Sequence, residues 1–153
     1  KTAMLFQAAA HAGAVLAGAN EKTEHALRDY GLHLGIAFQM VDDQLDYLGT
    51  PEELGKNIGD DLAEGKVTLP LIVAMRNGQP DQKAFVEDAI RNGGVENLPE
   101  MIQLVKATDA LKYTSEQANT ERCEALACLN NVADSEFKDS MNTLVNFVVD
   151  RHH

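Results

Sequence analysis

The segment from Glu21 to Leu48 constrains the fold most, because it keeps a helical pattern over its whole length. With roughly 100° of rotation per residue, its apolar side chains share one side of a helix: Leu27, Leu34, Phe38, Val41, Leu45 and Leu48. Asn20, directly before the segment, is a residue type that caps helix amino ends. No stretch of the chain shows the two-residue alternation of a half-buried strand. The sequence therefore predicts an all-α protein.

The other side of this helix carries a group of polar residues near its carboxyl end. Gln39, Asp42, Asp43 and Asp46 fall within an arc of roughly 100°. The helix dipole disfavours negative charge at that end, so the aspartates need compensation. They form either a solvated acidic surface or a platform for a hard cation such as Mg²⁺, which takes oxygen ligands and bridges carboxylates to phosphate. A structural zinc site is not expected, because no Cys or His shares the face.

A glycine-punctuated loop, residues 49–65, follows the aspartates directly. It contains the pair Gly55-Lys56 and the acidic pair Asp60-Asp61, and it ends at Gly65-Lys66. Glycine lets a backbone approach an anion closely, and a lysine ammonium group is a mobile point charge suited to phosphate. An ordinary surface loop would also contain such residues. Because the loop adjoins the aspartates, we favour a site that binds a diphosphate through metal ions.

Caps, prolines and glycines divide the rest of the chain into further helices. We expect helices over residues 1–19, 69–77 (after a Thr68 cap), 80–92, 98–132 (with a break near residues 108–109) and 134–150 (with Asp134 as cap). The last helix has an apolar stripe of Met141, Leu144, Val145 and Val148. Gly31 and Gly35 lie inside the long helix, where glycine is unfavourable, so we expect a packing or cavity reason for them.

Length and composition narrow the class of protein. A chain of 153 residues suits one domain, and a net charge of −11 argues against nucleic acid or an anionic membrane surface as a partner. No run of about 18 apolar residues predicts a transmembrane segment, and the amino end does not resemble a signal peptide. We interpret Cys123 and Cys128 as reduced packing residues of a cytoplasmic protein, and His152-His153 as a tag remnant.

Several motifs in order give the chain a family resemblance. They are Lys1-Thr2-Ala3, Phe38-Gln39-x-x-Asp42-Asp43-x-x-Asp46, Gly55-Lys56 and Gly59-Asp60-Asp61-Leu62-x-Glu64-Gly65-Lys66-x-Thr68-Leu69-Pro70-Leu71. In these residues the sequence resembles the trans-type polyprenyl diphosphate synthases, and within them the bacterial octaprenyl diphosphate synthase branch. The resemblance implies an antiparallel helical bundle, with residues 1–151 as the carboxyl-terminal half of an isoprenoid synthase domain. The upstream half, with the first aspartate-rich motif, would be absent, so we expect a fragment that is inactive alone.

The resemblance also implies roles for the metal and diphosphate ligands. Asp42 would bind Mg²⁺ directly, while Asp43 and Asp46 would hold its water shell. Lys1 and Lys56 would clamp the allylic diphosphate.

Four further residues would surround the substrates by the same resemblance. Lys66 would line the anionic pocket, and Thr2 and Gln39 would lie near the reacting carbon, where their oxygens stabilise a developing allylic cation. Phe38 would border the homoallylic substrate, although its position on the helix suits core packing equally well.

The implied activity is a Mg²⁺-dependent head-to-tail condensation of an allylic prenyl diphosphate with isopentenyl diphosphate. We expect a long, octaprenyl-like product for quinone side chains, and as partner either a second copy in a homodimer or the upstream half of the same enzyme. One alternative is a non-catalytic helical partner of a heteromeric prenyl diphosphate synthase. Another is a plain acidic bundle, which would not explain why Lys56 and Lys66 follow the aspartates. Terpene cyclases lack the Gly-Lys…Glu-Gly-Lys-x-Thr-Leu-Pro pattern, so elongation is favoured.

Overall fold

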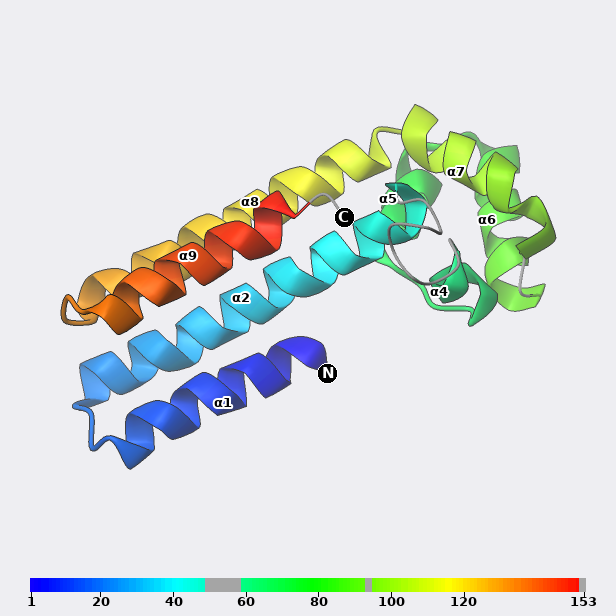
Figure 1. Cartoon of the computed structure of the whole chain (residues 1–153). Helices are drawn as coiled ribbons and strands as arrows, with labels where there is room; N and C mark the ends of the chain where they lie inside the picture. The colour runs from blue at the N-terminus through cyan, green and yellow to red at the C-terminus, as the bar shows by residue number, and fades with distance from the viewer. Residues whose placement is uncertain (49–58, 93–94, 152–153) are drawn as a thin grey trace. The chain divides into compact units, whose positions relative to one another are not determined.

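A computed structural model describes residues 1–48, 59–92 and 95–151 (Figure 1). The α-helices are α1 (Thr2–Leu16), α2 (Glu21–Leu48), α4 (Asp60–Ala63), α5 (Leu69–Asn77), α6 (Pro80–Asn92), α7 (Leu98–Ala107), α8 (Ala110–Cys128) and α9 (Glu136–Asp150). Short 3-10 helices occupy Val95–Asn97 and Leu129–Asn131. The described residues contain no strand, which confirms the predicted all-α class.

Local capping chemistry places most of these helices where the sequence predicts them. The side chain of Asn20 accepts a hydrogen bond from the Thr23 amide at 3.0 Å and starts α2. Pro70 lies in the first turn of α5, and Pro80 is the first residue of α6. The expected break between α7 and α8 occurs at Asp109, whose φ of 55° lies in the left-handed region.

Two local expectations were wrong, and a third was confirmed in position only. The short helix α4 lies inside the stretch predicted as a loop. The cap of α9 is Ser135, whose hydroxyl accepts from the Lys138 amide, whereas Asp134 pairs with the Lys138 ammonium group at 2.8 Å. Thr68 does occupy the amino-cap position of α5, but its side chain makes no capping hydrogen bond.

The chain divides into two compact units. The first unit comprises Lys1–Val41 and Gln117–Arg151, and the second comprises Asp42–Glu116. The helices α2 and α8 each contribute residues to both units. The expectation of one domain over residues 1–151 stays a prediction, and each unit is described by itself below.

In the first unit, α1, most of α2, the later part of α8, and α9 run alongside one another (Figure 1). Two glycines of α2 let α1 approach closely, because a Cβ at Gly31 would lie 2.6 Å from the Phe6 carbonyl oxygen, and one at Gly35 would lie 2.6 Å from the Ala3 Cα. These contacts confirm a packing reason for both glycines. The core consists of Tyr30, Leu34, Ala125, Leu129, Val145 and Val148.

Polar contacts connect the helices of the same unit. The Tyr30 hydroxyl donates to the Met141 carbonyl at 2.9 Å, and His33 lies 2.7 Å from the Glu121 carboxylate. On α9, Val145 and Val148 are buried as predicted, but Leu144 is half-exposed. Cys123 is also exposed, so the packing role expected for it was wrong, while Cys128 packs against the core.

The second unit has its own core. It consists of Tyr47, Leu62, Leu71, Val73, Ala74, Val86, Ala89, Met101, Leu104, Val105 and Ala110. The short helix α5 packs against α6 and α7, and α4 packs against α6. The end of α2 and the start of α8 complete this unit.

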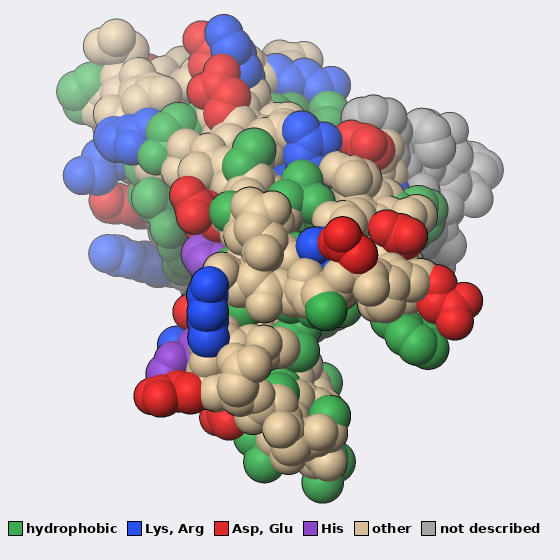
Figure 2. Space-filling view, turned by 90° about the vertical axis from the view of Figure 1, so that its left-hand side faces the viewer, with side chains coloured by type: hydrophobic (Ala, Val, Ile, Leu, Met, Phe, Trp, Pro, Cys, Tyr) green, Lys and Arg blue, Asp and Glu red, His purple; other side chains and the backbone are tan. Residues whose placement is uncertain are grey.

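The surface of α1 is apolar beyond its contact with α2. Leu5 is 73% exposed and Leu16 is 88% exposed, and Met4 and Val15 are also exposed. Within the first unit, this helix lies below α2 in Figure 1, and hydrophobic side chains show along the lower edge of the surface in Figure 2. In the part of the chain that the structure describes, no helix combines the length and hydrophobicity needed to span a bilayer.

Candidate functional site

The predicted site residues divide between the two units, and one helix, α2, carries residues of both. Lys1, Thr2, Phe38 and Gln39 belong to the first unit. Asp42, Asp43, Asp46 and Lys66 belong to the second unit. The predicted diphosphate ligand Lys56 lies outside the described residues.

In the first unit, the structure brings Thr2 and Gln39 together. The Thr2 hydroxyl donates to the Gln39 side-chain oxygen at 2.9 Å, although the two residues are 37 positions apart. The bond forms at the end of the close contact that Gly31 and Gly35 permit between α1 and α2. Lys1 precedes Thr2 as the exposed amino-cap residue of α1. The part of the site expected to stabilise a cation is thus assembled by helix packing.

Phe38 takes one of its two expected roles, packing in the core. Its ring centroid lies 5.5 Å from that of Phe6, and the Arg151 guanidinium carbon lies 4.2 Å from the Phe38 ring centroid. Arg151 also donates to the Phe38 carbonyl oxygen at 3.3 Å. The role beside a homoallylic substrate stays a prediction.

In the second unit, the aspartates at the end of α2 are partly or fully buried. Asp46 is fully buried, Asp43 is nearly so, and Asp42 is partly exposed. A carboxylate oxygen of Asp46 accepts a hydrogen bond from the Asp61 amide at 3.3 Å, and its backbone carbonyl accepts one from Gly59 at 3.3 Å. Asp46 therefore connects the end of α2 to the start of α4.

Lys66 completes the same group through Asp61. Its ammonium nitrogen lies 2.7 Å from an oxygen of Asp61 and 2.9 Å from one of Glu64. These bonds raise the pKa of Lys66 above its ordinary value, with Asp61 as the main cause. Asp61 is 7% exposed, and its backbone carbonyl also accepts from the Lys66 amide at 2.9 Å. The predicted neighbours Asp46 and Lys66 thus meet at one residue, Asp61.

Asp61 is the residue that sequence reasoning missed. The sequence presents Asp60-Asp61 only as an acidic pair, with no predicted role in the site for either residue. The spacing of Asp61 and Lys66 gave no signal, because residues five apart do not share a helix face; the contact depends on the turn at Gly65, whose φ of 67° accompanies the bond from the Lys66 amide to the Asp61 carbonyl. The predicted loop over residues 49–65 does not contain the helical turn, α4, that brings Asp61 and Lys66 together.

The donor set at the end of α2 suits a hard cation. Its side chains are carboxylates, and no sulfur or imidazole ligand is among them. Among the residues described, no three His, Cys, Asp or Glu side chains converge to hold an ion by themselves. Mg²⁺ usually takes one or two protein carboxylates and completes its shell with water and substrate phosphate. The residues therefore fit a cation that a diphosphate helps to hold, and magnesium binding stays a prediction.

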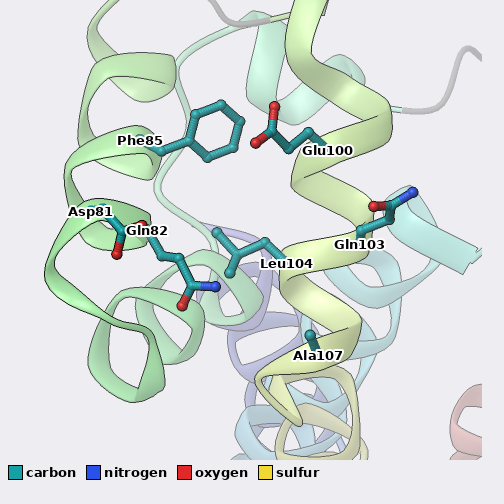
Figure 3. A pocket seen from close by; sticks show the side chains of 7 residues that line it. All are labelled: Asp81, Gln82, Phe85, Glu100, Gln103, Leu104 and Ala107. Carbon is teal, nitrogen blue, oxygen red and sulfur yellow. The ribbon is translucent and has the colours of Figure 1, made fainter.

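A separate cavity of about 340 Å³ lies between α6 and α7 (Figure 3). Phe85 of α6 and Glu100 of α7 point toward each other across it. The lining residues are Asp81, Gln82, Phe85, Glu100, Gln103, Leu104 and Ala107. None of them is a predicted site residue, so this cavity is distinct from the aspartate-rich end of α2.

The helices and the aspartate-rich end of α2 define an all-α protein of the isoprenoid synthase fold. The family model described as "Polyprenyl synthetase" matches residues 1–107. The octaprenyl diphosphate synthase of Haemophilus influenzae is 44% identical over the whole chain, which covers 47% of that relative. The chain belongs to the polyprenyl synthetase family.

A solved structure and a further relative extend the comparison. The polyprenyl synthase of Caulobacter crescentus CB15, complexed with calcium and isoprenyl diphosphate, superposes with a TM-score of 0.91 at 42% identity, over the whole chain and 47% of that structure. The heptaprenyl diphosphate synthase component 2 of Bacillus subtilis is 32% identical over 97% of the chain and 42% of its own length. The chain therefore spans about half the length of the relatives it matches.

Proposed function

We propose that the protein acts in a prenyltransferase that elongates an allylic prenyl diphosphate by condensation with isopentenyl diphosphate. The observation that carries the proposal is the connected group Asp46, Asp61 and Lys66, which places buried carboxylates and a cation at the end of one helix. The 44% identity to an octaprenyl diphosphate synthase supports a long, octaprenyl-like product, of the kind used for quinone side chains. We propose the cytoplasm as the place of action.

Charge separation explains why such residues suit this reaction. Breaking the carbon–oxygen bond of an allylic diphosphate leaves negative charge on the diphosphate and positive charge on carbon. Mg²⁺, held by Asp42, Asp43 and Asp46, would neutralise the leaving group when bound. The calcium and isoprenyl diphosphate in the Caulobacter crescentus structure support a cation and a diphosphate as ligands.

The lysines would also bind the negative charge of the diphosphate. Lys66 would exchange its half-exposed ion pair with Glu64 for a diphosphate oxygen while it keeps its bond to the buried Asp61. Lys1 and Lys56 would clamp the same diphosphate.

The side-chain oxygens of Thr2 and Gln39 are suited to stabilise the positive charge that develops on the carbon. Their hydrogen bond fixes the orientation of both side chains before a substrate arrives. Attack by the isopentenyl double bond then forms the new carbon–carbon bond, and a proton passes to the departing diphosphate. This scheme requires no nucleophilic side chain.

Because the chain covers about half of its relatives, we propose that the active assembly contains further helices, from the upstream half or from a partner. The exposed apolar side chains of α1 support this proposal, since a helix that is apolar all round is usually buried. We also propose a homodimer of the complete unit.

Calorimetric titration with inorganic pyrophosphate tests the proposal on the chain itself. We expect binding with Mg²⁺ and none in EDTA, because the carboxylates repel the anion unless a cation bridges them. Asp42→Asn should weaken the Mg²⁺-dependent affinity by at least about tenfold. The matched control is Glu87→Gln, which removes a half-exposed charge of α6 in the same unit and should change nothing. Equal binding in EDTA, or an unaffected Asp42→Asn variant, would contradict the proposal.

The alternative function is that of a non-catalytic helical partner in a heteromeric prenyl diphosphate synthase. It is supported by the relative named component 2 of a heptaprenyl diphosphate synthase. The aspartates and Lys66 are all retained, which favours the catalytic role. Turnover assays of the purified assembly discriminate the two, because Asp42→Asn abolishes turnover in the catalytic role and leaves it intact in the other.

A further inference from the structure

The cavity between α6 and α7 is built from one face of each helix. On α6, the lining residues Asp81, Gln82 and Phe85 are three and four positions apart, which places them on one side of the helix. On α7, the lining repeats at the same spacing from Glu100 to Ala107. The helix α5 packs against both α6 and α7. Both walls of the cavity are therefore held in place by the fold itself, as is usual for ligand sites.

Two pairs of side chains face each other across this cavity (Figure 3). Phe85 and Glu100 point toward one another, and one turn further along Gln82 and Leu104 do the same. Phe85 is partly buried and packs against the core of the second unit, and Leu104 is only 6% exposed. The side-chain oxygen of Gln82 accepts a hydrogen bond from the Gln79 amide at 2.8 Å. Three of the four facing side chains are thus held by contacts within the protein.

The charges of the cavity are all negative. Asp81 and Glu100 are exposed carboxylates, and among the described residues the lining includes no Lys, Arg or His. Each of the two lies in the first turn of its helix, where the helix dipole favours a negative charge. The dipole explains the two charges, but it does not explain the aromatic ring opposite Glu100. A cation between Phe85 and Glu100 would be attracted by both, because the face of an aromatic ring also binds cations.

The size and the remaining lining narrow the kind of cation. A volume of about 340 Å³ is near the lower end of the range for ligand pockets, roughly 300–1,000 Å³, so the ligand is small. A bare divalent ion requires several oxygen ligands, whereas Leu104 and Ala107 present only carbon side chains. A compound with a positive group and an apolar body would use both parts of the lining. The carboxylates of Asp81 and Glu100 would repel an anionic ligand such as a diphosphate.

We propose that the cavity between α6 and α7 binds a small organic cation, an ammonium or guanidinium group joined to a short apolar body. The positive group lies between Phe85 and Glu100, and the apolar body lies beside Leu104. This site is separate from the group formed by Asp46, Asp61 and Lys66, so it does not depend on the proposed function.

A titration of the whole chain with phenethylammonium, followed by two-dimensional amide NMR, tests the proposal. We expect saturable shifts at Gln82, Phe85, Glu100 and Leu104, with a dissociation constant on the order of 1 mM, as suits a ligand of this size. Phenethyl alcohol has nearly the same shape without the charge and should bind more weakly, and phenylacetate should not bind. Equal binding of the alcohol, or no saturable shifts at the lining, would overturn the proposal.

Two variants test the positive group's place. Glu100→Gln removes the charge at nearly constant shape, and Phe85→Leu removes the ring but keeps an apolar side chain. Each should weaken phenethylammonium by about two- to fivefold. Glu100→Gln should leave the weaker binding of phenethyl alcohol unchanged, which separates the loss of charge from damage to the cavity.

The matched control for these variants is Glu87→Gln. Glu87 is a half-exposed carboxylate of α6 outside the lining, so the variant should bind phenethylammonium as wild type does. High salt should weaken phenethylammonium and not phenethyl alcohol, because only the ammonium group is attracted by charge. Equal weakening in Glu87→Gln and Glu100→Gln would show a general response to net charge and overturn the site.

Discussion

Asp61 decides how the charges at the end of α2 are arranged. Its carboxylate holds Lys66 and its amide bonds to Asp46, so one buried residue connects the predicted cation to the predicted metal ligands. A buried carboxylate that pairs with a lysine keeps that lysine charged and in place. Removal of this one charge should therefore change the titration of Lys66 more than any other substitution nearby.

We predict that Asp61→Asn lowers the pKa of Lys66 toward its ordinary value, and that Glu64→Gln lowers it less, because Asp61 is the main cause of the rise. A raised lysine pKa contributes stability that is fully present below the ordinary lysine pKa, near 10.4, and is lost as pH rises through the raised value. The alkaline loss of stability should therefore be smaller in Asp61→Asn. NMR titration of the Lys66 ammonium group measures both midpoints, and a larger shift in Glu64→Gln would contradict the assignment.

A second residue, Tyr30, should lower the stability of the first unit at alkaline pH. Burial raises its pKa to about 12, while its hydroxyl donates to the Met141 carbonyl. The unfolded chain ionises this phenol near pH 10 but the folded chain does not, so its contribution is complete below pH 10 and falls between about pH 10 and 12.

We predict that Tyr30→Phe lowers the free energy of unfolding by about 1 kcal/mol at neutral pH, through the lost hydrogen bond. The difference from wild type should shrink above pH 10, because the variant has no phenol to ionise. Urea unfolding between pH 8 and 11.5 measures this difference. Parallel curves for the two proteins would show that Tyr30 does not limit alkaline stability.

At the level of the helices, the contact between α1 and α2 depends on two glycines of α2, Gly31 and Gly35, which have no side chain. Alanine is the better helix former by roughly 1 kcal/mol, so glycine inside α2 has an intrinsic cost. The close packing of α1 against α2 offsets this loss of helix stability, because α1 backbone atoms occupy the space that the two Cβ atoms would fill.

We predict that Gly31→Ala destabilises the protein by about 1–3 kcal/mol despite the gain in helix propensity, because backbone atoms of Phe6 and Gln7 cannot move aside easily. Gly13→Ala is the matched control, since a Cβ there meets no atom within 4 Å, and it should stabilise by up to about 1 kcal/mol. Thermal unfolding of the two variants should shift Tm in opposite directions. A stabilising Gly31→Ala would show that α1 does not pack as described.

The sequence predicts helices well where local chemistry decides their ends. Asn20, Pro70 and Pro80 each favour a helix start in the turn where they lie. The helices α2, α5 and α6 therefore begin where they are expected. The errors arise where two local signals compete or where tertiary contacts decide. Ser135 and Asp134 are both good caps, and Lys138 engages both. The exposure of Leu144 depends on how α9 is rotated against its neighbours, which its own stripe does not specify.

The same distinction applies to the candidate site. Helix periodicity alone places Gln39, Asp42, Asp43 and Asp46 together. The bond between Thr2 and Gln39 and the position of Asp61 depend on packing between elements, so residue spacing could not supply them. The family resemblance named Thr2 and Gln39, but it gave Asp61 no role.

For the whole molecule, the unmatched half of the relatives and the exposed apolar face of α1 both indicate that α1 associates with another polypeptide. Although the chain has a net charge of −11, α1 contains no Asp, Glu, Lys or Arg, where a solvent-facing helix would normally have several, and its one histidine, His11, lies 2.7 Å from Glu24 of α2. The exposed Leu5 and Leu16 sit near opposite ends of α1, so the apolar surface runs along most of the helix. Exposed apolar surfaces of this kind mark sites of association.

We predict that the isolated chain self-associates in a concentration-dependent manner through this face, because no other helix of the first unit covers it. The double variant Leu5→Gln, Leu16→Gln should reduce this association in sedimentation velocity experiments and leave the thermal unfolding midpoint nearly unchanged, since both side chains are already in solvent. A matched control is Phe137→Gln, which removes an exposed apolar side chain from α9 and should leave association through α1 intact. When the chain is combined with a polypeptide that supplies the unmatched half of a relative, the same double variant should weaken the complex. Association that is unaffected by Leu5→Gln, Leu16→Gln but lost in Phe137→Gln would assign the contact to α9 instead.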